Sequence, residues 1–389
     1  MKTVKALYAH INTEKDFKKK YPGYNPDDGK VHVLFLSACS NESSYYRLIL
    51  PALELNRTDT HAAIISDIHK WDFNKLFDDY DNPIDYRLVK WADYVVMPVL
   101  FTDVEYIIRN MREINSDIEF VMDVDQNYHE LPDYHPDYRK LRPDLKDKLL
   151  GNFFKVDILT APNSAILNYY GHLAEQNTEE LELYLERYNN LLSNFTFDEI
   201  SGIQRNQNER VRIGLILDPS QVNDFKTIEP ALVSLHNTFK EKIELIIYGW
   251  NEKIAEQNGL LKDLPVIYER PVPFFDYHNK LNSLALDIGL LPFVNNAFNV
   301  AGKAWLRYLD FSVNMVPVIA PAMNPFNRII TEGENGFIAV SEEEWAAKVS
   351  QLIENTEQRQ KIGSYAHKFV WENYSYNPKA IQRLRSVFI

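Results

Sequence analysis

The feature of this sequence that most constrains its fold is an alternation of short apolar runs with helical stretches. The run Val31–Ser37 (VHVLFLS) has the apolar character of a strand that is buried on both faces of a parallel sheet. Further strand-like runs of this first series are Ala62–Ser66, Tyr94–Val99, Glu119–Asp123 and Ile158–Thr160, and helical stretches such as Thr102–Asn115 lie between them. Strands that alternate with helices in this way predict a doubly wound parallel sheet.

A second series of the same kind predicts a second α/β domain. Its strands are expected at Val211–Leu217, Ile243–Tyr248, Val266–Glu269, Ile288–Pro292, Val316–Ala320 and Phe337–Val340. Its helices are expected at Thr227–Phe239, Phe275–Ser283, Ala301–Ser312, Glu342–Glu354 and Gln358–Glu372. A helix around Glu179–Leu192 and an exposed linker at Phe195–Asn208 separate the two series, because the composition there becomes polar.

The length of the chain fits this organisation. Its 389 residues suit two α/β domains of about 150–200 residues each. We predict an N-terminal Rossmann-like domain over residues 1–200, with an extension at 1–29, a second Rossmann-like domain over 201–374, and a C-terminal segment at 375–389. A ligand is expected in the crevice between the two halves, at the carboxyl ends of the strands.

Composition narrows the classes of partner and compartment. The formal net charge of −13 repels phosphate backbones, so extended nucleic-acid binding is not expected, although a local basic pocket can hold one small anion. The single cysteine, Cys39, excludes a disulfide within one chain and is expected to be a buried thiol. No signal peptide or membrane span is recognisable, so a cytoplasmic location is expected. Lys15–Lys20 (KDFKKK) is the best candidate for peripheral membrane contact, but a solvated face accounts for it more simply.

The stretch Asp287–Val340 carries the clearest chemistry. An apolar strand is followed by a loop with three asparagines, and a helix begins near Ala301–Lys303. Backbone N–H groups at a helix N-terminus attract phosphate, and Lys303 adds positive charge to that turn. Arg307 follows one turn later, and Asp310 shares the helix face of Lys303, where a carboxylate can accept hydrogen bonds from a ribose diol. The alternative is that all three side chains lie on a solvated helix face.

The same stretch resembles the donor-binding region of GT-B glycosyltransferases of the GT4 family. The matching motifs are Phe298-Asn299, Lys303-Ala304, Arg307, Leu309-Asp310-Phe311, Met315–Ala320 and Glu332–Phe337. The resemblance covers most of residues 30–375 and is most specific over 287–340. It departs from the family at the Glu-x7-Glu signature, because Asp310 replaces the second glutamate and the first is absent. Asn299 or backbone groups are the candidates to replace that first acid.

The resemblance implies a fold, an activity and a set of site residues. The fold is GT-B, with an N-terminal acceptor domain and a C-terminal donor domain that face each other across a cleft, and with a closing helix that returns to the first domain. The activity is transfer of a sugar from a nucleotide-diphosphate sugar (a UDP- or GDP-sugar) to a glycan, lipid-linked or other acceptor, with retention of configuration and without a metal or a tightly bound cofactor. The implied donor-binding residues are Lys226, Gly249, Val272, Phe298, Asn299, Lys303, Arg307 and Asp310. Lys303 is also the main catalytic candidate, because positive charge stabilises a leaving diphosphate.

A polar loop also follows the first strand, over Ser37–Tyr46. Ser43 or Ser44 is expected to cap the helix that begins there. Arg47, one turn later, either forms a local salt bridge or faces the cleft. The resemblance favours the cleft, which makes Arg47 a second catalytic candidate.

A pair of acids, Asp123 and Asp125, ends another strand of the N-terminal half. Three roles compete for them: a place in the acceptor cleft, as in relatives, capping of the next turn, or binding of a divalent metal through paired carboxylates. The cleft is favoured, and Asp125 is the third catalytic candidate. His129 and His135 are expected to be ordinary loop histidines. Two rival functions stay open: a sugar-nucleotide epimerase or phosphorylase of the same fold, and a non-catalytic protein that binds nucleotides or sugars.

Overall fold

The computed structural model describes residues 4–37, 42–67, 84–135, 137–175, 184–186, 202–262, 264–301 and 304–389. The chain folds into two compact units. The first comprises Met1–His129, Leu141–Asp198 and Tyr374–Ile389, and the second comprises Glu130–Lys140 and Glu199–Asn373. The domain boundaries expected from the sequence stay predictions.

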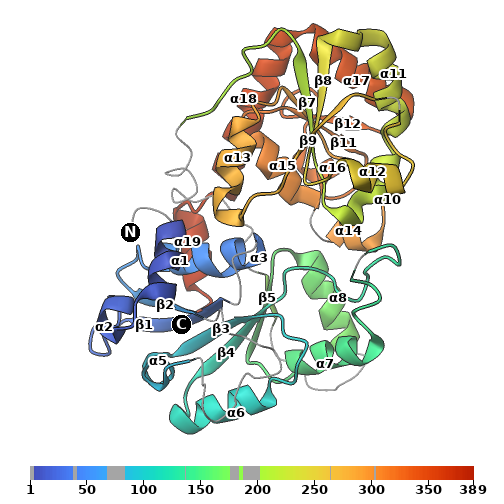
Figure 1. The fold of residues 1–389 in the computed structure, drawn as a ribbon. Coiled ribbons are helices and arrows are strands. Elements are labelled where there is room, and N and C mark those ends of the chain that lie inside the picture. Colours follow the sequence, from blue (N-terminus) through green and yellow to red (C-terminus); the bar gives the residue numbers. More distant parts are fainter. Residues whose placement is uncertain are drawn as a thin grey trace. The chain divides into compact units, whose positions relative to one another are not determined.

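A parallel sheet forms the centre of the first unit (Figure 1), and in the described part of the chain its strands run in the order β2-β1-β3-β4-β5-β6. The strands are β1 (Val31–Ser37), β2 (His61–Asp67), β3 (Tyr94–Pro98), β4 (Glu119–Asp123), β5 (Ile158–Ala161) and β6 (Tyr184–Glu186). The helical elements are α1 (Val4–Thr13), α2 (Phe17–Lys20), α3 (Glu42–Ser44), a π-helical turn (Tyr45–Ile49), α4 (Leu50–Leu55), α5 (Tyr86–Trp91), α6 (Glu105–Ile114), α7 (Pro143–Phe153), α8 (Ser164–Glu175) and α19 (Pro378–Arg385).

Most strands of the first unit match their predictions, but the helix predicted around Glu179–Leu192 is wrong at its centre. Tyr184–Glu186 forms strand β6, which pairs in parallel with β5 through Tyr184 opposite Leu159. Pairing with the edge of a sheet outweighs helical propensity here, because propensity is a weak preference that tertiary contacts override. Cys39 and the first half of the predicted linker, residues 195–201, lie outside the described residues.

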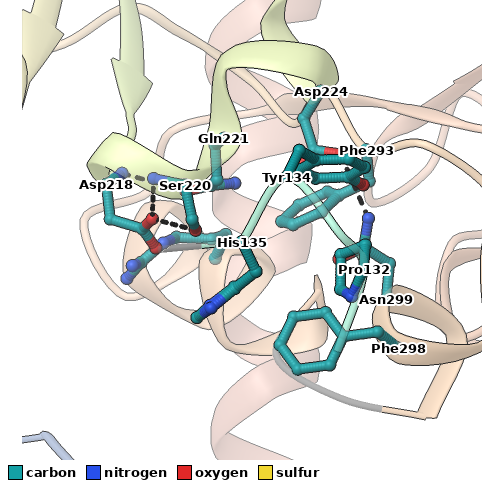
Figure 2. Close-up of a pocket in the computed structure, with 11 residues that line it drawn as sticks. Pro132, Tyr134, His135, Asp218, Ser220, Gln221, Asp224, Phe293, Phe298 and Asn299 are labelled. Atoms are coloured by element: carbon teal, nitrogen blue, oxygen red, sulfur yellow. Dashed lines mark hydrogen bonds between the residues drawn. The ribbon is translucent and has the colours of Figure 1, made fainter. Parts of the chain in front are cut away.

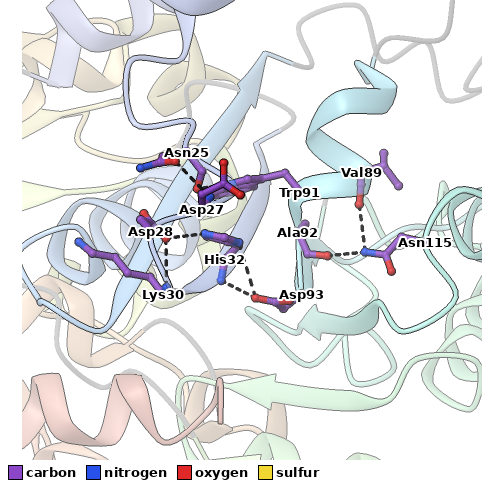
Figure 3. A network of polar contacts seen from close by, with 10 residues as sticks. All are labelled: Asn25, Asp27, Asp28, Lys30, His32, Val89, Trp91, Ala92, Asp93 and Asn115. Atoms are coloured by element: carbon purple, nitrogen blue, oxygen red, sulfur yellow. Dashed lines mark hydrogen bonds and ion pairs between the residues drawn. The ribbon is translucent and has the colours of Figure 1, made fainter.

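The segment that precedes β1 is fixed to the first unit by a network around His32 (Figure 3). His32 is 7% exposed, and its ring stacks on Trp91 with ring centroids 4.5 Å apart. Its Nε2 atom lies 2.9 Å from Asp28 Oδ1, and its backbone N–H donates to Asp93 Oδ2 over 2.8 Å. The Trp91 indole donates to the carbonyl of Asn25 over 3.2 Å. The predicted N-terminal extension is thus packed against the sheet at its last residues.

A second parallel sheet forms the centre of the second unit, with its described strands in the order β12-β11-β10-β7-β8-β9. The strands are β7 (Val211–Ile216), β8 (Ile243–Tyr248), β9 (Val266–Glu269), β10 (Ile288–Leu290), β11 (Val318–Pro321) and β12 (Phe337–Ala339). The α-helices are α10 (Val222–Lys226), α11 (Glu229–Phe239), α12 (Glu252–Gln257), α13 (Tyr277–Ser283), α14 (Ala297–Ala301), α15 (Ala304–Ser312), α16 (Phe326–Ile329), α17 (Glu342–Glu354) and α18 (Thr356–Tyr374), and short 3₁₀ turns lie at Pro219–Gln221, Lys240–Lys242 and Phe274–Asp276.

The strand order of this second sheet defines a switch point. Counted from β7 as its first strand, the order from β9 to β12 is 3-2-1-4-5-6. The chain moves outward from β7 to one edge and then returns to β10 on the other side, so a crevice forms at the carboxyl ends of β7 and β10. The core beneath the crevice includes Phe225, Ile247, Trp250 and Leu352, all of them buried.

The predicted helix at Ala301–Ser312 is confirmed at each of its residues that the structure describes. The helical chain begins earlier, with α14 at Ala297, and α15 begins at Ala304. Residues 302 and 303 lie outside the described part, so the structure says nothing of Lys303. Among the helices that are described, none combines the length and the apolarity that crossing a bilayer requires.

Candidate functional site

A pocket lies at the switch point of the second sheet (Figure 2). Three parts of the second unit line it: the loop after β7, the segment from the end of β10 to α15, and the segment Glu130–Lys140, which we call the strap. The lining residues are Pro132, Tyr134, His135, Asp218, Ser220, Gln221, Asp224, Phe293, Phe298, Asn299 and Arg307. The pocket therefore combines aromatic faces, hydrogen-bonding groups and a guanidinium, a mixture typical of small-molecule sites.

The loop after β7 is held in one conformation by its own side chains. Asp218 Oδ1 accepts a hydrogen bond from the Ser220 backbone N–H over 2.8 Å and another from the Ser220 hydroxyl. The Gln221 side chain accepts in return from the Asp218 N–H over 3.0 Å, which completes a capping box. The buried Trp250 indole donates to the Asp218 carbonyl over 2.8 Å. The resemblance pointed to this loop through Lys226 alone, although Asp followed by Pro and Ser is also typical of a helix start.

Gly249, directly after β8, packs closely against the backbone of this loop. Its φ of +103° favours glycine, and a Cβ atom at this position would lie 2.1 Å from the carbonyl oxygen of Leu217. The resemblance implied that Gly249 lies beside the nucleotide. In the structure Gly249 lies against the backbone of the loop that lines the pocket, and it is not itself among the described lining residues.

Asp224 connects the loop after β7 to the segment that follows β10. Its Oδ1 atom accepts hydrogen bonds from the Val294 backbone N–H over 2.8 Å and from Asn299 Nδ2 over 3.1 Å. Asn299 also donates to the Val294 carbonyl over 2.9 Å. Asp224 is only 3% exposed, and this burial raises its pKa from 3.8 to about 6, although the two donors act in the opposite direction. A buried carboxyl with a raised pKa beside a pocket is a feature of functional sites.

The strap covers one side of the pocket. The Tyr134 hydroxyl accepts a hydrogen bond from Asn296 Nδ2 over 2.9 Å. The His135 ring meets Phe298 edge to face, with centroids 5.4 Å apart. The backbone N–H of Asp137 donates to His135 Nδ1 over 3.1 Å, which leaves the proton of a neutral ring on Nε2. His135 was expected to be an ordinary loop residue, yet it lines the pocket, and no local signal in the sequence indicates this.

Arg307 brings positive charge to the pocket and is held there by two buried residues. Its Nη1 atom donates to Asp310 Oδ2 over 2.9 Å and to the Tyr277 hydroxyl over 3.1 Å. The Tyr277 hydroxyl itself donates to Asp310 Oδ2 over 2.7 Å. Burial raises the pKa of Asp310, and the charge of Arg307 opposes that rise. Asp310, predicted as a ribose ligand, is not among the described residues that line the pocket.

The other two implied donor residues lie away from the pocket lining. Lys226 is exposed at the end of α10, and its Nζ atom reaches Asn223 Oδ1 at 3.5 Å. The backbone N–H of Val272 donates to the Tyr248 hydroxyl over 3.0 Å, so it is already engaged. Neither residue is among the described lining residues, and their roles toward a donor stay predictions.

A second polar cluster lies within the first unit, at the carboxyl end of β4. Arg47, in the π-helical turn, binds Asp123 with two hydrogen bonds, Nε to Oδ1 over 2.7 Å and Nη2 to Oδ2 over 2.6 Å. The Thr160 hydroxyl donates to Asp123 Oδ2 over 2.6 Å. Burial raises the pKa of Asp123, and Arg47 opposes that rise. Arg47 therefore forms a salt bridge with Asp123, and its place in the cleft stays a prediction.

Asp125 lies beside this cluster and has different partners. Ser43 donates its hydroxyl to Asp125 Oδ2, and the Tyr128 hydroxyl donates to Oδ1 over 2.5 Å. Ser43 and Ser44 lie inside helical turns, and the Ser44 side chain makes no capping hydrogen bond, so the predicted capping role is wrong for Ser44. In the part of the chain that is described, no three His, Cys, Asp or Glu side chains gather as metal ligands.

These two parallel-sheet units define the GT-B fold that the sequence predicted. Solved structures of glycosyltransferases share it. A TarM mutant of S. aureus, in complex with Fondaparinux, alpha-GlcNAc-glycerol and UDP, has 13% sequence identity and a TM-score of 0.52 over 78% of this chain, which covers only 58% of TarM. Anabaena Alr3699/HepE, in complex with UDP-glucose, has 12% identity and a TM-score of 0.55 over 92% of this chain and 98% of its own. A glycosyltransferase from Rickettsia africae has 14% identity and a TM-score of 0.54 over 94% of this chain and 97% of its own.

These comparisons establish the fold alone, because structural similarity at such low sequence identity does not show a shared function. No protein-family model matches the chain. No curated protein matches it either.

Proposed function

We propose that this chain is a glycosyltransferase whose donor is a nucleotide-diphosphate sugar, a UDP- or GDP-sugar, bound in the pocket of the second unit. The observation that carries the proposal is the position of that pocket at the switch point of a 3-2-1-4-5-6 sheet, with Arg307 among its lining residues. Structural neighbours with the same fold were crystallised with UDP or UDP-glucose, which supports this class of ligand.

The pocket residues suggest how a donor is held. Phe298, Phe293 and Tyr134 offer aromatic faces to a base or a sugar, and Asn299 and Ser220 offer polar groups to hydroxyls. Arg307 supplies charge to the diphosphate, and Lys303, four residues earlier, is proposed to act with it. Glycosyl transfer breaks the bond between the sugar and the diphosphate, so cations that stabilise the leaving diphosphate lower the barrier. This scheme needs no protein nucleophile and no metal, and we propose that configuration is retained.

The acceptor is proposed to be a glycan or another hydroxyl-bearing molecule that binds to the first unit. Asp125 and Arg47 are the proposed catalytic residues there. The contacts of Arg47 with Asp123 favour a structural role for the arginine, whereas Asp125 is only half-buried and has hydroxyl partners. Replacement of Asp125 and of Arg47 by Asn or Ala distinguishes a catalytic role from a structural one. Loss of a structural residue changes the melting temperature as well as turnover.

A panel of nucleotide-sugars tests the proposal. UDP- and GDP-sugars are added to the purified chain, and the ligand that binds is expected to raise the melting temperature according to its affinity. The Lys303→Ala and Arg307→Ala variants are then expected to lose turnover by about 100-fold or more with that donor. A donor that is consumed without any acceptor indicates an epimerase. Binding without consumption in the presence of varied acceptors indicates a non-catalytic protein, and unchanged turnover of both variants contradicts the proposed site.

A further inference from the structure

Asp310, Tyr277 and Arg307 form a closed triangle of hydrogen bonds. Arg307 Nη1 donates to both partners, over 2.9 Å to Asp310 and 3.1 Å to Tyr277, and Tyr277 donates to the same Asp310 oxygen over 2.7 Å. The side chain of Asp310 is 3% exposed and that of Arg307 is 13% exposed. A buried carboxylate therefore lies behind a guanidinium that reaches the pocket.

The triangle is built on a rigid support. The Tyr277 ring stacks on Phe274, with centroids 5.3 Å apart and an interplanar angle of 18°. The Tyr277 ring also lies beside Tyr248, at the end of β8, with a centroid distance of 5.8 Å. Arg307 and Asp310 are three residues apart on α15 and so lie on one face of that helix. Contacts from β8, α13 and α15 thus fix the hydroxyl and the carboxylate before any ligand binds.

We infer that Asp310 and Tyr277 are positioning residues, which hold Arg307 in the pocket for the negatively charged part of the ligand. The inference rests on the proposed function and deepens it. It departs from the prediction that Asp310 accepts hydrogen bonds from a ribose diol. A ribose that bound Asp310 would have to reach a side chain that is almost fully covered and whose Oδ2 atom already accepts from Arg307 and Tyr277.

The two roles of Asp310 predict different losses of affinity. A positioning residue acts through Arg307, so the change Asp310→Asn is expected to weaken binding of UDP by about 10- to 100-fold, the worth of a hydrogen bond to a charged group. Binding of uridine, which lacks phosphate, is expected to change less than about 2-fold. If Asp310 instead binds the ribose, its loss weakens uridine and UDP by the same factor. The loss is then smaller for 2′-deoxy-UDP, which lacks one of the two ribose hydroxyls. The guanosine series replaces the uridine series if GDP binds the wild type more tightly.

The experiment uses isothermal titration with the full chain and four variants. The double variant Arg307→Ala/Asp310→Asn is expected to bind UDP no more weakly than Arg307→Ala alone, because the acid acts through the arginine. Tyr277→Phe removes one hydroxyl, keeps the stacked ring and is expected to weaken UDP about 3- to 10-fold. This mild variant tests the inference even if Asp310→Asn folds poorly, which its melting temperature and circular dichroism reveal.

The outcomes separate the inference from the proposed function. A wild-type chain that binds neither UDP nor GDP overturns both. If the wild type binds UDP, two results overturn only the positioning role. One is an equal loss of affinity for uridine and UDP in the variants, and the other is losses that add in the double variant. The positioning role is supported if Asp310→Asn lowers the affinity only for phosphate-bearing ligands and causes no further loss when Arg307 is already replaced by Ala.

Discussion

Asp224 is a single residue on which the electrostatics of the pocket depend. Its carboxyl group is buried between the loops after β7 and β10, and its pKa is raised from 3.8 to about 6. A raised pKa means that the native state holds the proton more tightly than the unfolded chain does. The associated stability is therefore present in full below about pH 4 and is lost as the pH rises to about 6.

The change Asp224→Asn is expected to remove this pH dependence. Two pKa units correspond to about 3 kcal/mol, so the variant is expected to be more stable than the wild type by up to about 3 kcal/mol at pH 8, and not at pH 4. The amide oxygen can still accept from Val294 and Asn299. Urea unfolding between pH 4 and pH 8 measures the difference, and Glu256→Gln, at an exposed acid of α12, is the control. A difference that is constant over this range contradicts the assignment.

The contacts of Asp310 and Arg307 are only partly predictable from their spacing in the sequence. Helical spacing alone indicates that the two side chains share a face of α15. It does not indicate that Tyr277, 33 residues earlier, lies close enough to bind both. Whether a helical carboxylate points to a ligand or to a buried neighbour depends on such distant contacts, so helical spacing left both a ribose contact and a solvated helix face open for Asp310.

At the level of elements, the loop after β7 depends on the absence of a side chain at Gly249. Gly249→Ala is expected to destabilise the second unit by about 3 kcal/mol or more, because the backbone has φ +103° and a Cβ atom would overlap the Leu217 carbonyl. Gly259→Ala is the matched control, since that residue also has positive φ (+68°) but its Cβ would lie 3.9 Å from the nearest atom, the flexible end of Lys262. Its cost is expected to be about 1 kcal/mol. Equal losses in chemical unfolding would show that only the backbone angle matters.

The strap is the second element with a testable consequence. Tyr134→Phe removes the hydroxyl that accepts from Asn296, and a neutral hydrogen bond is worth about 1 kcal/mol. Local opening of residues 130–140 is therefore expected to become about 5-fold more frequent, as measured by hydrogen exchange of their amides. Tyr365→Phe, at an exposed tyrosine of α18, is the control in the same unit. Unchanged exchange of the strap in Tyr134→Phe would mean that other contacts hold it.

These elements also mark how far the sequence could predict the fold. Continuous apolar runs identified strands such as β4 (Glu119–Asp123) and β8 (Ile243–Tyr248) to the residue, because burial on both faces leaves a strong local signal. β6 gave no such signal, since only its pairing with β5 makes it a strand. The strap is polar and irregular, and nothing local indicates that Tyr134 and His135 line a pocket built mainly by residues 218–307.

At the scale of the whole molecule, the chain crosses between its two units at 129/130, 140/141, 198/199 and 373/374. The first two crossings bring the strap to the second unit, so the pocket takes residues from both halves of the sequence. Ligand binding should therefore leave a discontinuous signature along the chain. Three separated stretches, the strap, the loop over 217–226 and α15, each contribute residues to the pocket.

Hydrogen exchange of the full chain, with and without the nucleotide-sugar that binds, is expected to show that signature. Protection should rise in all three stretches, because a bound ligand shifts the equilibrium away from their open states. The amino ends of β7 and β10, near Val211 and Ile288, lie at the opposite edge of the sheet and serve as the internal control. The Arg307→Ala variant at the same ligand concentration should show less added protection in proportion to its lost affinity. Protection confined to the first unit, with none in the strap or in α15, would contradict a donor site at the switch point of the second sheet.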